Sequence, residues 1–199
     1  MTQGLLNFIT GERDKKNIFK PILQPDMIID NDIQIIDVVS NEHCEHVRKL
    51  IYHFVNWHRT RHLEDLELID EYFDKKDFEE ELESLPGKYS KPNGRLLLAM
   101  LDGEPAGCVA LRKIDDQACE MKRMFVYTKF HGKGVGRALS GKLINEARII
   151  GYQTIKLDTS FRQIEAQKLY QSIGFKVTKP YYELPKKLED WLVFMEMKL

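Results

Sequence analysis

Hydrophobic and polar positions repeat with two different periods along this 199-residue chain, and these periods predict the order of its elements. Apolar residues three and four positions apart indicate helices, whereas short apolar runs bounded by turn residues indicate strands. The expected elements are a strand at 33–39, a helix that Asn41 caps and that ends near Trp57, a helical stretch within 64–85, strands at 95–101, 106–114 and 118–126, a helix at 134–150, a strand at 154–158, a helix around Tyr170, and strands at 175–182 and 191–197.

Turn residues divide this pattern into a body and an extension. Asp102-Gly103 is a strong hairpin signal between two apolar runs, and Gly151 and Gly174 each stand where a helix should end. Residues 1–32 contain two prolines and scattered apolar residues, so we expect an N-terminal extension that packs on the body or on a partner. The predicted body is a single domain at 33–199.

A glycine-rich turn joins the strand that ends at Val126 to the next helix. Gly132, Gly134 and Gly136 allow a tight bend and a close backbone approach, and a helix N-terminus presents unpaired N–H groups to an anion. Lys133 and Arg137 flank this turn, where a helix would ordinarily favour acids. The segment predicts a phosphate site; the alternative is a plain strand-to-helix connection. Its glycine spacing matches neither the nucleotide P-loop nor the dinucleotide fingerprint.

The strand before this turn loses its alternation at Lys122 and Arg123. Cys119 and Met121 occupy one parity, and the apolar residues that follow occupy the other. An inserted bulge residue produces such a change of phase. The alternative is an ordinary strand with two charges at the surface.

Composition limits the partners. The 30 basic and 31 acidic residues nearly cancel, so no global positive field predicts binding to nucleic acid or to a membrane. No apolar run approaches the ~18 residues of a membrane span, and the first residues lack the apolar core of a signal peptide. The three cysteines form no Cys-x-x-Cys pair. These features predict a cytoplasmic, reduced protein.

Two segments resemble the GNAT superfamily of N-acetyltransferases. The first is His131-Gly132-Lys133-Gly134-Val135-Gly136 after the strand that begins at Glu120, and the second is Ala166-x-x-Leu169-Tyr170-x-x-x-Gly174-Phe175. The resemblance implies an α/β (α+β) fold, with a mixed, mostly antiparallel central sheet and helices on both faces. It also implies transfer of acetyl from acetyl-CoA to a primary amine of a small molecule or peptide, by direct attack.

The resemblance assigns cofactor contacts to two stretches. Main-chain groups of the bulged strand would pair with the pantetheine arm, and the glycine turn would hold the pyrophosphate. His131 stands where the family usually has Gln or Arg. The residues assigned in this way are Met124, Phe125, Val126, His131, Gly132, Lys133, Gly134, Val135, Gly136 and Arg137.

The resemblance also suggests two catalytic residues. An amine attacks only when it is neutral, so a base or a water held by a base must take its proton, and Glu120 is the candidate. The alternative for Glu120 is an ion pair with Lys122 or Arg123. Tyr170 is the candidate acid that protonates the departing thiolate; the alternative is a packing tyrosine with a solvated hydroxyl.

Other features support weaker hypotheses. The pairs His43/His46 and His58/His62 have helical spacing for metal ligands, but no further ligand is evident, so we expect polar helix positions and no metal. The eleven acids of 64–83 could guide a cationic amine or form a solvated face. Apolar residues of the extension could support a homodimer.

A regulatory domain that binds acetyl-CoA without turnover is the alternative function, and a nucleotide-phosphate binder is a third.

Overall fold

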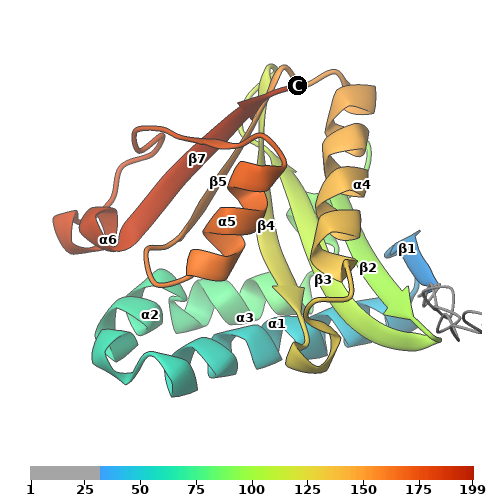
Figure 1. The fold of residues 1–199 in the computed structure, drawn as a ribbon, viewed down its shortest axis with the longest axis horizontal. Helices are drawn as coiled ribbons and strands as arrows, with labels where there is room; N and C mark the ends of the chain where they lie inside the picture. The colour runs from blue at the N-terminus through green and yellow to red at the C-terminus, as the bar shows by residue number, and fades with distance from the viewer. Residues whose placement is uncertain (1–31) are drawn as a thin grey trace, which may run out of the picture. The chain divides into compact units, whose positions relative to one another are not determined.

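The structure is a computed structural model that describes residues 32–199, and a seven-stranded sheet forms its centre (Figure 1). The predicted extension, apart from Asp32, lies outside the described residues. The strands are β1 (Ile33–Asp37), β2 (Arg95–Leu101), β3 (Glu104–Lys113), β4 (Ala118–Val126), β5 (Thr154–Ser160), β6 (Lys176–Val177) and β7 (Leu192–Lys198). The helices are α1 (Asn41–Arg61), α2 (Leu66–Tyr72), α3 (Lys75–Glu83), α4 (Val135–Ile150), α5 (Ile164–Ser172) and α6 (Lys186–Trp191), with short 3₁₀ turns between them.

The strand order is β1-β2-β3-β4-β5-β7-β6, and every neighbouring pair is antiparallel except β4 and β5. The parallel pair is short. Only Ala118, Cys119 and Glu120 of β4 have partners on β5, after which the two strands separate. The mixed, mostly antiparallel sheet confirms the predicted fold class.

Helices cover both faces of the sheet, as predicted. On one face, Val47, Leu50 and Ile51 of α1 pack with apolar residues of α2, α3 and the sheet. On the other, Leu139 and Leu143 of α4 pack against β2, β3 and the α5 region. Figure 1 shows α1, α2 and α3 together along one end of the strands, with α4 and α5 on either side of β4. The sheet therefore separates two apolar cores.

Several predicted boundaries were wrong. Ser40, not Asn41, caps α1, because its hydroxyl accepts from the His43 amide, and the helix continues to Arg61. The stretch 64–85 holds two helices, separated by the cap that Asp74 provides for α3. The predicted strand 175–182 pairs only over Lys176–Val177, and α6 was not predicted.

Tertiary packing explains the short β6. Tyr181 and Tyr182 turn their rings onto Phe194 of β7, at centroid distances of 5.5 Å, instead of continuing the ladder. Burial of two aromatic rings outweighs a strand preference that the sequence alone suggests.

Among residues 32–199, no helix combines the length and the apolar character needed to cross a membrane.

Candidate active site

A β-bulge interrupts the pairing of β3 with β4. Ala110 lies opposite Lys122 and Cys108 lies opposite Phe125, so β4 carries one extra residue, and Arg123 has φ of 55°. A positive φ is uncommon for a residue other than glycine. The predicted bulge is confirmed.

A cavity of about 500 Å³ lies beside the end of β4, lined also by α1, the start of α4 and α5. Every residue assigned to the cofactor from the sequence lines this cavity except Lys133. The lining residues from the predicted set are Met124, Phe125, Val126, His131, Gly132, Gly134, Val135, Gly136 and Arg137.

The glycine turn has the backbone geometry of an anion cradle. Gly132 and Gly134 have φ of 76° and 87°, which side chains other than glycine rarely adopt, and Gly134 is the N-cap of α4. No side chain caps this end and its first turn holds no acid. The first N–H groups of α4 therefore remain available to an anion. Gly136 has another role, since a Cβ there would lie 3.2 Å from Leu169 of α5.

Two side chains of the turn contact other elements. The His131 ring lies with Nε2 2.9 Å from the Val126 carbonyl, so the imidazole donates to the end of β4 and closes the turn. Arg137 Nη2 donates to the Ser172 hydroxyl at 2.9 Å, which joins α4 to α5. His131 thus supports the turn from within, besides lining the cavity.

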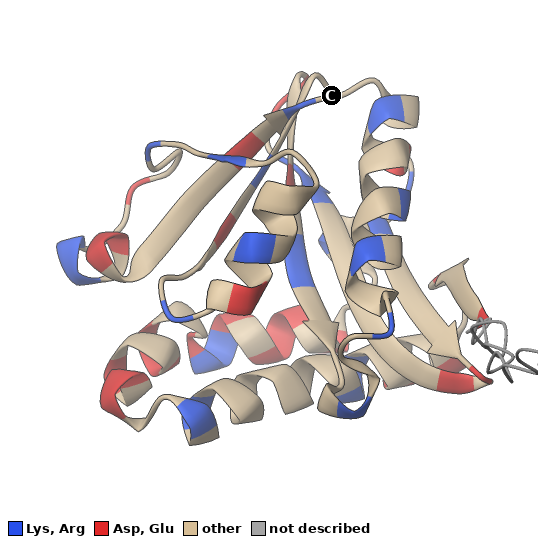
Figure 2. Ribbon diagram, in the orientation of Figure 1, with Lys and Arg blue, Asp and Glu red and all other residues tan. Residues whose placement is uncertain are grey.

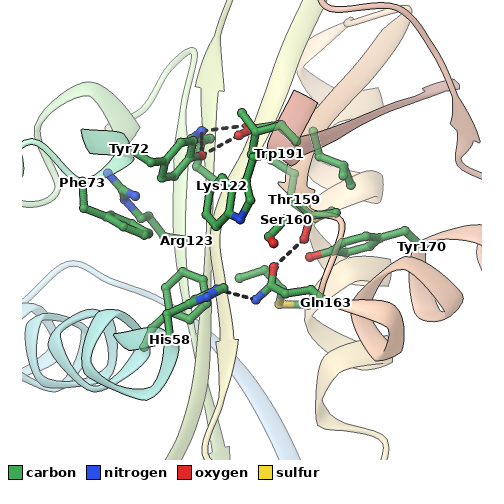
Figure 3. Close-up of a pocket in the computed structure, with 16 residues that line it drawn as sticks. His58, Tyr72, Phe73, Lys122, Arg123, Thr159, Ser160, Gln163, Tyr170 and Trp191 are labelled. Carbon is green, nitrogen blue, oxygen red and sulfur yellow. Dashed lines mark hydrogen bonds and ion pairs between the residues drawn. The ribbon is translucent and has the colours of Figure 1, made fainter. Parts of the chain in front are cut away.

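A second, smaller cavity of about 50 Å³ lies between β4, β5 and the α1–α2 helices (Figure 3). Polar side chains dominate its wall, among them Lys122, Asp158 and Gln163. It shares four lining residues with the 500 Å³ cavity: Phe54, Met124, Gln163 and Tyr170. We call this shared region the junction. A group held in the larger cavity and a group held in the smaller one would meet there.

Tyr170 lies at the junction and is 6% exposed. Its ring packs on Phe175 at 5.9 Å, as the packing alternative expects. Its hydroxyl, however, has no hydrogen-bond partner among residues 32–199 and is not sealed from the cavity. Burial raises the pKa of this phenol above its usual range, so the group is a proton donor at neutral pH.

Glu120 lines neither cavity. Its side chain is fully buried, and one oxygen accepts from Arg112 Nε while the other accepts from the Tyr181 hydroxyl at 2.7 Å. Lys122 Nζ lies 3.6 Å away. The ion-pair surroundings that the sequence suggested are present, although Arg112, rather than Arg123, provides the close cation.

A carboxylate that the sequence analysis left out does face the smaller cavity. Asp158 accepts from Lys122 Nζ at 2.8 Å and from the Tyr72 hydroxyl at 2.5 Å. Burial acts to raise the pKa of Asp158, but Lys122 and the hydrogen bonds outweigh it and lower that pKa. Asp158 is therefore ionised and paired at neutral pH.

Sequence analysis considered His58 only as a possible metal ligand and gave Gln163 no role. Gln163 donates from Nε2 to His58 Nε2 at 2.7 Å and accepts from the Thr159 hydroxyl (Figure 3). An amide nitrogen only donates, so the His58 ring is neutral and carries its proton on Nδ1. Burial, followed by the charge of His62, lowers the pKa of His58 to about 4. The only sequence signal for Gln163 was its place three residues before Ala166.

The histidine pairs form no metal site. Within residues 32–199, no group of three or more His, Cys, Asp or Glu side chains is placed to hold a metal ion. His58 and His62 are buried rather than surface positions, because their rings pack with Trp57 and with each other. Figure 2 shows acidic residues on α2 and α3, the predicted acidic run, and basic residues along α4.

Comparison with known proteins agrees with the two sequence motifs. A family model described as the acetyltransferase (GNAT) family matches residues 51–175. An uncharacterized N-acetyltransferase of Schizosaccharomyces pombe is 37% identical over 109 residues, which cover 54% of this chain and 67% of the relative. The N-acetylaspartate synthetase of Homo sapiens is 38% identical over 101 residues, covering 49% of this chain but only 33% of that protein.

The fold has solved counterparts. The PaiA N-acetyltransferase of Thermoplasma acidophilum, solved in complex with coenzyme A, superposes with a TM-score of 0.63 at 19% identity. The match covers 84% of this chain and 99% of that protein. At this identity the likeness establishes the shared fold.

Proposed function

Because the chain belongs to the GNAT acetyltransferase family, we propose that it transfers acetyl from acetyl-CoA to a primary amine by direct attack. The observation that carries this proposal is the junction, where Tyr170 lines both cavities and its protonated hydroxyl has no hydrogen-bond partner among residues 32–199. One cavity would then hold the thioester and the other the amine.

The residues of the larger cavity fit acetyl-CoA. Gly132 and Gly134 leave open space at the uncapped start of α4, and Arg137 adds a positive charge beside it. Such a helix N-terminus suits a pyrophosphate. Beyond Glu120, the β4 backbone has no β5 partner, so main-chain groups of Met124 to Val126 can pair with the pantetheine arm. Acetyl-CoA supplies the activated acetyl group.

In the proposed reaction, the amine nitrogen bonds to the thioester carbonyl carbon, and the carbon–sulfur bond then breaks. Tyr170 gives its hydroxyl proton to the departing sulfur. Glu120 receives the amine proton through water, because its carboxylate lines neither cavity.

The base role of Glu120 is tested by Glu120→Gln, which should lower turnover roughly 10²-fold and remove the acidic limb of the pH–rate profile. A profile of unchanged height and shape would leave Glu120 a structural ion-pair partner only.

The acceptor we propose is a small molecule. The volume of the smaller cavity, about 50 Å³, favours a compact amine over a folded protein. The relatives named N-acetylaspartate synthetase have, by their name, an acetylated amino acid as their product. The alternative is a regulatory domain that binds acetyl-CoA without turnover.

Two measurements separate these functions. Thermal unfolding with acetyl-CoA, CoA, ATP or NAD identifies the cofactor, because a ligand at a hundred times its dissociation constant stabilises the folded state by about 2.7 kcal/mol. Release of free CoA thiol with a panel of amines then reports turnover. Stabilisation by acetyl-CoA with no thiol release from any amine would support the regulatory domain and contradict the enzyme.

A further inference from the structure

The bulge in β4 places two cationic side chains on one face of the sheet. Successive residues of a regular strand point to opposite faces, so Lys122 and Arg123 would ordinarily separate. Here the positive φ of Arg123 changes the phase, and Figure 3 shows Lys122 beside Tyr72 and Arg123 beside Phe73. Lys122 reaches Tyr72 and Arg123 reaches Glu81. Both cations line the smaller cavity.

Each cation is nearly buried, with 12% of the Lys122 side chain and 11% of the Arg123 side chain exposed. Such charges require nearby opposite charges. Arg123 donates to Glu81 from Nε at 2.6 Å and from Nη2 at 2.9 Å. Its guanidinium also lies 5.3 Å from the centre of the Phe73 ring. Lys122 pairs with Asp158 and lies near Glu120.

These pairs leave the cluster one positive charge in excess. Lys88 also binds Glu81, and Arg112 also binds Glu120, so each of these two carboxylates serves two cations. In addition, Arg123 Nη1 has no acceptor among residues 32–199 and is not sealed from solvent. The cluster comprises the cations Lys88, Arg112, Lys122 and Arg123 and the carboxylates Glu81, Glu120 and Asp158.

We propose that the acceptor amine carries a carboxylate, and that Arg123 and Lys122 bind this carboxylate in the smaller cavity. The inference rests on the proposed acetyltransferase function and names its substrate class: small anionic amines of the amino-acid type. An arginine whose Nη1 has no acceptor among the described residues suits a carboxylate, and Lys122 adds a second cation to the wall of the same cavity. In an amino acid the amine lies close to the carboxylate. A carboxylate bound by Arg123 and Lys122 would therefore place the amine near the junction, where Tyr170 lies.

The experiment compares amines that differ only in this charge. CoA thiol release by the full chain is measured with L-aspartate against its α-amide (L-isoasparagine), with L-alanine against L-alaninamide, and with spermidine as a cationic amine. We expect kcat/KM to be at least tenfold higher for each acid than for its amide, and spermidine to react most slowly. Equal or faster turnover of the amides or of spermidine would overturn the inference while leaving the acetyltransferase function intact. No thiol release with any amine would overturn both.

Variants assign the preference to residues. Arg123→Gln and Lys122→Met should raise the KM for the acidic amine at least tenfold and leave the KM for acetyl-CoA unchanged. The matched control is Arg95→Gln, which removes another buried arginine, paired with Glu146 and lining neither cavity. It should keep the preference. If Arg123→Gln does not fold, the double variant Glu81→Gln/Arg123→Gln removes the pair without leaving a buried charge. A folded variant that keeps the full preference for acids would overturn the assignment.

Discussion

Tyr170 combines two features that rarely occur together, a buried ring and a hydroxyl without a partner among the described residues. If it protonates the departing thiolate, Tyr170→Phe should lower kcat by about 10² to 10⁴ with acetyl-CoA affinity unchanged. Steady-state kinetics and acetyl-CoA titration check both quantities. A fully active, stable Tyr170→Phe protein would contradict the acid role.

Tyr152 provides the matched control. Its hydroxyl also belongs to a buried ring but donates to the Asn93 carbonyl at 2.8 Å, away from both cavities. Tyr152→Phe should cost about 0.5–1.5 kcal/mol of stability and leave turnover unchanged. The two variants thus separate a chemical role from a packing role.

His58 makes a prediction about pH. Its pKa is about 4 in the folded state against 6.5 as a free side chain, so the unfolded chain binds its proton first as the pH falls. Its contribution to stability is fully present above pH 6.5 and is lost as the pH falls toward 4, by about 3 kcal/mol at most. The stability lost in His58→Phe, relative to the unchanged protein, should therefore be largest at pH 7 and should shrink as the pH is reduced. Denaturant titrations between pH 7 and pH 4.5 measure this difference.

His46 is the control on the same helix, since its side chain is partly exposed. In the same titrations the His58→Phe protein should lose acid sensitivity that the unchanged chain shows, and His46→Asn controls for the removal of a histidine from α1. A His58→Phe protein with the same acid sensitivity as the unchanged chain would show that His58 is not the responsible group.

Sequence reasoning predicted the structural features that depend on neighbours along the chain. The glycine turn and the bulge at Lys122 and Arg123 can be recognised in the sequence, because each one interrupts the local pattern of apolar and polar residues. Gln163 and its partner His58 are not, because 105 residues separate them and only the packed fold brings them together. Whether a carboxylate lines a cavity, as Asp158 does, depends equally on distant elements.

At the scale of elements, the start of α4 carries the main prediction. Gly134 has φ of 87°, and a Cβ there would have its nearest contact at 3.8 Å, so a larger residue would strain the turn and enter the cavity. Gly134→Val should abolish acetyl-CoA binding while the protein stays folded. Isothermal titration of the variant checks the loss.

The control for this variant is Gly141→Ala in the same helix. A Cβ at Gly141 would meet nothing within 4 Å, and alanine favours a helix interior over glycine by about 1 kcal/mol. This variant should bind acetyl-CoA normally and melt at a higher temperature. Normal binding by a folded Gly134→Val protein would rule out the glycine turn as the cofactor site.

Element prediction succeeded where the local pattern is strong and failed where packing decides. The hairpin at Asp102-Gly103 formed as expected, with φ of 53° and 80° at its two central residues. The strand expected at 175–182 is mostly absent, since Tyr181 and Tyr182 pack on Phe194. No local sequence pattern predicts a contact of this kind.

At the scale of the whole described domain, the sheet consists of two parts joined by one short parallel pairing. Strands β1 to β4 lie in chain order, and the hairpin signal at Asp102-Gly103 predicts the pairing of β2 with β3. The place of β5 beside β4, and of β7 between β5 and β6, was not predicted from the sequence, because it depends on packing between segments far apart along the chain. The acceptor remained unreadable from the sequence, because the cationic face arises from a backbone bulge and from helices far away in the chain.

The three-residue pairing of β4 with β5 has a consequence for hydrogen–deuterium exchange. Amides of β4 beyond Glu120 that point toward β5 have no strand partner there, so they should exchange with solvent faster than amides paired with β3. Acetyl-CoA, if its pantetheine arm completes the ladder, should slow exchange in the peptide 121–127, whereas ATP should not. In this protein the cofactor would then act as the missing strand that joins the two parts of the sheet.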